Sequence, residues 1–134
     1  MKAAHMEAEP LPVVVVGVGG VGALTLQALR ESPLVEVVGL SDNSSGVAER
    51  VGREFGVPVY TDSRRLLAET RPRAAYLAVP PMAAPDIVAA CAQRGIHVWK
   101  ELPLARSLDE GMAMVRRMEK AGLKFAVSTQ RRFA

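Results

Sequence analysis

Three glycines near the start of the chain have the spacing of a phosphate-binding turn. They are Gly17, Gly19 and Gly22, and they follow directly on the valine run Val13–Val16. In such a turn the first glycine permits a tight bend, the second lets the backbone approach a pyrophosphate, and the third lets a helix pack closely on the strand. The N–H groups at the start of that helix favour a negatively charged ligand. The chemistry predicted here is the binding of a dinucleotide.

The residues on either side of the glycines predict the elements that this turn requires. The valine run is typical of a strand buried on both faces, and Leu24, Ala28 and Leu29 recur at helical spacing after the glycines. Glycines also serve ordinary tight turns, so the spacing alone decides little. Its place between a buried strand and an amphipathic helix indicates a dinucleotide fingerprint.

A carboxylate follows where the ribose of a bound nucleotide is expected. Residues 35–40 predict a second strand, and Asp42 lies just beyond its end, 20 residues after Gly22. There it can accept hydrogen bonds from the adenosine ribose and repel the additional phosphate of NADP. Because Asn43 follows rather than an arginine, we expect NAD to be preferred, with NADP as the alternative if Ser44 and Ser45 donate to a phosphate. Asp42 can instead cap the next helix or begin a turn.

Strand and helix patterns alternate through the rest of the chain. Further strands are predicted at 57–60, 74–79, 96–100 and 123–127, with helices between them. Short right-handed crossovers then predict a single α/β domain, a doubly wound parallel Rossmann sheet in the order 3-2-1-4-5-6. We expect residues 13–134 to form this dinucleotide-binding domain and residues 1–12, which lack periodicity, to be a disordered tail or expression remnant.

The loop after the predicted fourth strand completes the expected crevice. Val79, Pro80 and Pro81 come where the order of a doubly wound sheet reverses, so we expect them to form the floor near the nicotinamide ribose. His97 lies at the opposite end of the next strand, which favours a structural role over a catalytic one.

Composition excludes several other functions. A hydrophobic fraction of 49% with only 4% aromatic residues suits a parallel sheet covered by helices. A net charge of +3, with scattered arginine pairs, argues against nucleic acid. The single Cys91 lies in an apolar helical pattern, which favours a buried thiol over a nucleophile or metal ligand and predicts a reducing, cytoplasmic compartment. We expect no metal site, no signal peptide and no membrane span.

Several short motifs between Val13 and Phe133 carry a family resemblance. They are Gly17-x-Gly19-x-x-Gly22, Ser41-Asp42, Glu54-Phe55-Gly56-Val57-Pro58 leading to Asp62, Ala78-Val79-Pro80-Pro81, Gly95-Ile-His-Val98 and Glu101-x-Pro103-Leu104-Ala105. Their order and spacing resemble the N-terminal half of the glucose-fructose oxidoreductase / inositol dehydrogenase / MocA family. The resemblance implies a six-stranded domain that binds NAD or NADP. It also implies a following α/β domain, absent here, that holds a sugar-like or other small substrate and mediates oligomerisation.

Two positions depart from the family pattern. The resemblance implies a Glu-Lys-Pro whose lysine transfers a proton beside the nicotinamide, but this chain has Glu101-Leu102-Pro103. Lys100, two residues before Leu102, is the one candidate acid/base group. The family's frequent histidine after the fourth strand aligns with Ala84.

Together these features predict the cofactor-binding domain of an NAD(P)-dependent oxidoreductase that transfers hydride to or from a small hydroxy or carbonyl substrate. We expect a fragment of a longer enzyme, inactive by itself. The alternative is a non-catalytic sensor or interaction module that binds the dinucleotide and lacks the catalytic lysine. The candidate cofactor-binding residues are Gly17, Gly19, Gly20, Val21, Gly22, Asp42, Asn43, Val79, Pro80, Pro81 and Glu101.

Overall fold

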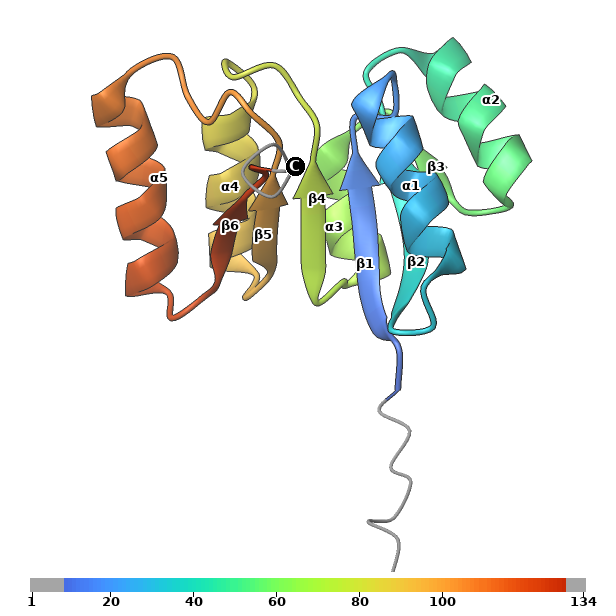
Figure 1. Cartoon of the computed structure of the whole chain (residues 1–134), viewed down its shortest axis with the longest axis horizontal. Coiled ribbons are helices and arrows are strands. Elements are labelled where there is room, and N and C mark those ends of the chain that lie inside the picture. The colour runs from blue at the N-terminus through green and yellow to red at the C-terminus, as the bar shows by residue number, and fades with distance from the viewer. Residues whose placement is uncertain (1–8, 130–134) are drawn as a thin grey trace, which may run out of the picture.

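Strands and helices alternate throughout the computed structural model, which describes residues 9–129 (Figure 1). The strands are β1 (Leu11–Val16), β2 (Val35–Ser41), β3 (Val59–Tyr60), β4 (Ala74–Leu77), β5 (His97–Lys100) and β6 (Phe125–Val127). The helices are α1 (Val21–Glu31), α2 (Ser45–Phe55), α3 (Ser63–Thr70), α4 (Ala84–Gln93) and α5 (Leu108–Lys120). No helix of the described residues is long and apolar enough to cross a membrane.

All six strands are parallel and lie in the order β3-β2-β1-β4-β5-β6, so the predicted fold class and strand order are confirmed. From β1 the chain first builds the sheet to one side and then returns to add β4 on the other. Val16 at the end of β1 is paired with Ser41 of β2 and with Leu77 of β4. This is the point at which the strand order reverses, where ligands of open α/β sheets bind.

Helices cover the two faces of the sheet unequally (Figure 1). α1 and α2 lie on one face, over a core that includes Val15 and Tyr76, and α3, α4 and α5 lie on the other, over Val14 and Val16. The valines of β1 therefore alternate between two cores, as the strand period of two requires, and the expectation of a strand buried on both faces is confirmed.

The helix ends follow local hydrogen-bonding preferences. Ser107 begins α5 as its N-cap, with its hydroxyl accepting from the Glu110 N–H at 3.2 Å, and Asp62 caps α3 in the same manner through the Arg64 N–H at 2.9 Å. Gly56 ends α2 in the left-handed conformation, with φ at 66°. These caps fix where each crossover returns to the sheet.

Some boundaries and faces differ from the expectation. β1 begins at Leu11, so part of the segment expected to be a tail pairs with β2, while residues 1–8 lie outside the described range. β4 ends at Leu77 rather than at residue 79, because the chain turns away towards Pro80, which has no N–H to continue a ladder. In α1 Leu26 is fully buried in the core and Leu29 packs against it as expected, whereas Leu24 is 69% exposed.

Candidate functional site

The turn between β1 and α1 has backbone contacts that leave no room for side chains at two of its glycines. Gly17 has a φ of 86°, and a Cβ placed on it would collide with the carbonyl oxygen of Ala78, just after β4. A Cβ on Gly22 would collide with the carbonyl oxygen of Gly17. β1, β4 and the first turn of α1 therefore meet at one point through their main chains.

Gly19 is different because a Cβ there would meet no atom within 4 Å. The fold itself does not require glycine at this position, so the clearance is available to a ligand. The next residue, Gly20, has a φ of 51° and stands at the start of α1, which has no side-chain cap and no acidic residue in its first turn. The start of α1 can thus receive an anion without competition from a carboxylate of its own first turn.

The Asp42 carboxylate ties the end of β2 to the glycine turn. Its Oδ2 accepts a hydrogen bond from the Val18 N–H at 3.0 Å, and its Oδ1 accepts from the Ser44 N–H at 2.9 Å. Ser44, not Asp42, is the N-cap of α2. Asp42 thus makes a turn with Ser44, as its alternative role predicts, and also holds the loop at Val18. Each carboxylate oxygen still has a lone pair for a ribose hydroxyl.

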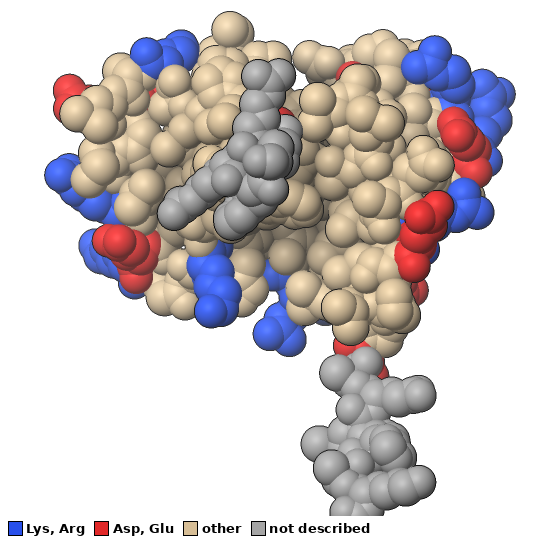
Figure 2. Space-filling model, viewed as in Figure 1, with Lys and Arg blue, Asp and Glu red and all other residues tan. Residues whose placement is uncertain are grey.

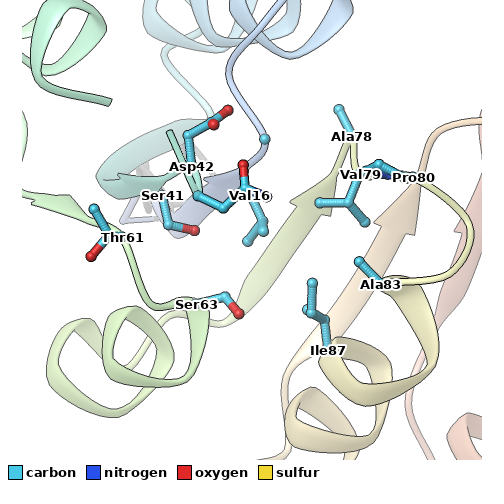
Figure 3. A pocket seen from close by; sticks show the side chains of 12 residues that line it. Val16, Ser41, Asp42, Thr61, Ser63, Ala78, Val79, Pro80, Ala83 and Ile87 are labelled. Carbon is cyan, nitrogen blue, oxygen red and sulfur yellow. The ribbon is translucent and has the colours of Figure 1, made fainter. Parts of the chain in front are cut away.

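A pocket of about 230 Å³ opens beside Asp42 at the carboxyl edge of the sheet (Figure 3). Pockets for whole drug-sized ligands measure roughly 300 to 1,000 Å³, so this one suits a part of a dinucleotide. We call it the β2–β4 pocket. Its lining residues are Val16, Gly17, Ser41, Asp42, Asn43, Thr61, Ser63, Ala78, Val79, Pro80, Ala83 and Ile87.

The β2–β4 pocket has the chemistry that an adenosine half needs. One side carries the Asp42 carboxylate and hydroxyl groups, and the other is built of apolar side chains such as Val79 and Ile87 (Figure 3). The hydroxyl of Ser41 is buried there without a hydrogen-bond partner. A buried polar atom in that condition indicates that the pocket is built for a polar ligand, so the residues fit the implied dinucleotide.

A second hollow, of about 620 Å³, lies on the α1 side of the sheet and includes Val21 and Glu101. It is open because no helix of the described residues covers β5 and β6 there, and Trp99 is 40% exposed. Glu101 Oε2 accepts a hydrogen bond from the Tyr76 hydroxyl at 2.8 Å, and burial raises the pKa of Tyr76 to about 12. Tyr76 therefore stays a neutral donor that orients Glu101.

Lys100 is fully buried rather than open to the crevice. Its Nζ donates to the carbonyl oxygens of Glu101 at 2.9 Å and Pro103 at 2.8 Å. Burial lowers the pKa of this ammonium below its ordinary value. In the structure Lys100 holds the loop after β5, while Leu102, at the position of the family lysine, is exposed. The acid/base role of Lys100 stays a prediction.

The other titratable candidates have structural surroundings. Burial raises the pKa of the Cys91 thiol to about 12, which leaves it protonated and unreactive. His97 Nδ1 accepts from the Lys124 N–H at 3.0 Å, at the start of β5. Within residues 9–129 no cluster of His, Cys, Asp and Glu could hold a metal ion. On the face shown in Figure 2, Lys and Arg lie at the rim interspersed with Asp and Glu.

The model of a family described as "Oxidoreductase family, NAD-binding Rossmann fold" matches residues 11–129. The chain belongs to this family. The predicted resemblance to the glucose-fructose oxidoreductase / inositol dehydrogenase / MocA proteins is therefore confirmed, and the chain is an NAD-binding Rossmann domain of an oxidoreductase family.

Relatives with named activities are dehydrogenases. D-xylose 1-dehydrogenase (NADP(+)) 2 of Haloferax volcanii is 30% identical over 120 residues, 89% of this chain and 37% of its own length. Scyllo-inositol 2-dehydrogenase (NAD(+)) of Bacillus subtilis is 29% identical over 121 residues, 89% of this chain and 35% of its own length. The chain thus spans little more than a third of these relatives.

A solved structure shows the same architecture. The WlbA dehydrogenase from Bordetella pertussis, in complex with NADH and UDP-GlcNAcA, superimposes with a TM-score of 0.87 at 25% sequence identity. The match covers 92% of this chain and 38% of that protein.

The structure divides the predicted cofactor residues between the two hollows and the turn. Gly17, Asp42, Asn43, Val79 and Pro80 line the β2–β4 pocket, whereas Val21 and Glu101 line the second hollow. Val79 and Pro80, expected near the nicotinamide ribose, thus lie across the same pocket from Asp42 (Figure 3). The pocket also includes residues that were not among the predicted cofactor residues, namely Val16, Ser41, Thr61, Ser63, Ala78, Ala83 and Ile87. Ser41 directly precedes Asp42 at the end of β2, and this adjacency was the signal that could have placed Ser41 in the site.

The close approach at Gly22 gives a stability prediction. Gly22→Ala places a methyl group against the Gly17 carbonyl oxygen, so α1 must shift, and we expect the free energy of unfolding to fall by more than about 2 kcal/mol. The matched control is Gly46→Ala in α2, where a Cβ meets nothing and stability should rise by about 0.5 kcal/mol. Chemical denaturation measures both. Equal stability of the two variants would contradict the packing described here.

Proposed function

We propose that this chain is the cofactor-binding domain of an NAD-dependent oxidoreductase that oxidises or reduces a sugar-like or other small hydroxy or carbonyl compound. The observation that carries the proposal is the clearance above Gly19, which lies between the β2–β4 pocket and the start of α1. A pyrophosphate in that clearance connects an adenosine half on one side with a nicotinamide half on the other.

Each part of the cofactor has matching residues in this proposal. The adenosine occupies the β2–β4 pocket with its ribose hydroxyls at Asp42, the pyrophosphate lies against Gly19 and Gly20, and the second ribose lies towards Glu101. The bound cofactor supplies the hydride chemistry, and the protein supplies position and charge. The substrate class is supported by relatives whose names specify D-xylose and scyllo-inositol.

A second candidate is a dinucleotide-binding sensor or interaction module without catalysis. It is favoured by Leu102 at the family's lysine position, by Ala84 at the histidine position and by the engagement of Lys100 Nζ with two carbonyl groups. For both candidates, we expect oligomerisation to be mediated by a substrate domain of the kind that the family resemblance implies.

Binding through the glycine turn is tested by Gly19→Val. A Cβ at this position meets no atom of the fold within 4 Å, and the valine side chain fills the clearance that the pyrophosphate needs. We expect an unchanged melting temperature and an NAD affinity reduced by at least about 30-fold, a loss of roughly 2 kcal/mol or more. Isothermal titration calorimetry measures the affinity, with Gly111→Ala in α5, where a Cβ makes only ordinary van der Waals contacts, as the remote glycine control. Equal affinity of Gly19→Val and the parent chain would remove the proposal.

Cofactor preference is tested by comparing NAD with NADP. The Asp42 carboxylate repels a 2′-phosphate, so NAD should bind about 10-fold more tightly than NADP at low salt. Asp42→Asn should reduce this difference in affinity. Because ions screen the repulsion, raising the salt concentration should also reduce the difference in affinity between NAD and NADP. NADP binding as tightly as NAD in the parent chain at low salt would overturn the ribose assignment of Asp42.

Turnover by this chain alone is expected to be absent. Hydride transfer requires a substrate held near the nicotinamide and a group that moves the accompanying proton, and positioning alone accounts for about 7 to 11 kcal/mol of a barrier. An absorbance assay with NAD and a panel of sugars, polyols and hydroxy acids should show only background reduction. Turnover that Lys100→Ala abolishes would show instead that these 134 residues form an enzyme.

A further inference from the structure

Ser41, the last residue of β2, has a hydroxyl group that the fold leaves without a partner. The residue is 2% exposed, and its Oγ forms no hydrogen bond with any other described residue. Its main chain is engaged, because its carbonyl oxygen accepts from the Gly17 N–H at 2.8 Å. The strand end is therefore fixed while the side-chain hydroxyl remains unsatisfied, which destabilises the ligand-free protein.

Ser41 is one of the residues that line the β2–β4 pocket, and its hydroxyl is buried just behind the surface of that pocket. Figure 3 shows the Ser41 and Ser63 side chains on one side of this space, with Val79 and Ile87 facing them from the other. A ligand part that fits between these walls has apolar faces for the valine and isoleucine and a polar edge for the serine. A flat heteroaromatic base has that combination.

The position of Asp42 indicates which base this is. Asp42 is adjacent to Ser41 in the chain and lines the same pocket, so a nucleoside whose ribose is held by Asp42 brings its base next to the Ser41 hydroxyl. In a dinucleotide the sugar at this site is the adenosine ribose. Adenine offers ring nitrogens that accept and an exocyclic amine that donates, and a serine hydroxyl can pair with either because it both donates and accepts.

We propose that the Ser41 hydroxyl recognises the polar edge of the adenine base and is a determinant of affinity for the adenosine half of the cofactor. The inference rests on the proposed function. It adds a contact with the base to a site whose other proposed contacts are with the ribose and the pyrophosphate.

The test titrates the 134-residue chain with ADP-ribose, which carries the adenine and both ribose groups but no nicotinamide. Two variants separate hydrogen bonding from shape. Ser41→Ala removes the hydroxyl, and Ser41→Cys fills a similar space with a poor hydrogen-bonding group. We expect both to bind ADP-ribose about 3- to 10-fold more weakly than the parent chain.

Thermal unfolding without ligand supplies the readout that a merely structural role would change. Removing an unsatisfied hydroxyl should leave the melting temperature of Ser41→Ala equal to or above that of the parent. The control is Ser32→Ala at the far end of α1, where the hydroxyl accepts from the Leu34 N–H at 3.2 Å. This variant should lose stability and keep its ADP-ribose affinity.

The possible results distinguish a failure of the proposed function from a failure of the Ser41 contact alone. Failure of the parent chain to bind ADP-ribose would contradict the proposed function itself. Parent-like binding by Ser41→Ala, or by Ser41→Cys, would overturn only the base contact. A joint fall of ligand-free melting temperature and affinity in Ser41→Ala would assign Ser41 a structural role and overturn the contact as well.

Discussion

The close backbone contact among β1, β4 and α1 is the constraint on which the candidate site depends. Gly17 is pressed against the Ala78 carbonyl, and Gly22 against the carbonyl of Gly17 itself, so neither position admits a side chain. This contact draws the start of α1 over the point where the strand order reverses. Asp42 then fastens the end of β2 to the same turn through the Val18 N–H. The candidate site lies next to these atoms, at the carboxyl edge of the sheet.

Much of this arrangement could be predicted from the sequence because its causes are local. Four consecutive valines indicate a strand that is buried on both faces, and the glycine spacing indicates the turn that must follow it. The right-handed rule for crossovers, together with a reversal of strand order next to the phosphate-binding turn, then favours the strand order that is observed. Strand ends were less predictable, since β4 stops at Leu77 where the ladder gives way to a turn, although the apolar pattern continues to Val79.

The remaining features depend on contacts between residues far apart in the chain. Tyr76 and Glu101 are joined by a hydrogen bond across 25 positions, and no spacing rule relates them. The partners of Lys100 Nζ are carbonyl groups of the following loop, so its burial could not be inferred from the charge of the residue. The unsatisfied state of Ser41 depends on the surrounding pocket, which includes residues from β1, β2, α3, α4 and the loops next to them.

The central claim is that the turn after β1 and the β2–β4 pocket together bind one dinucleotide. A titration of the isotope-labelled chain with NAD, followed by nitrogen–proton correlation spectra, tests it residue by residue. We expect the largest shifts at the amides of Gly19, Gly20, Asp42 and Val79, and little change at His97 on the opposite edge of the sheet. Shifts confined to the hollow around Trp99, or none at the glycine turn at saturating NAD, would contradict it.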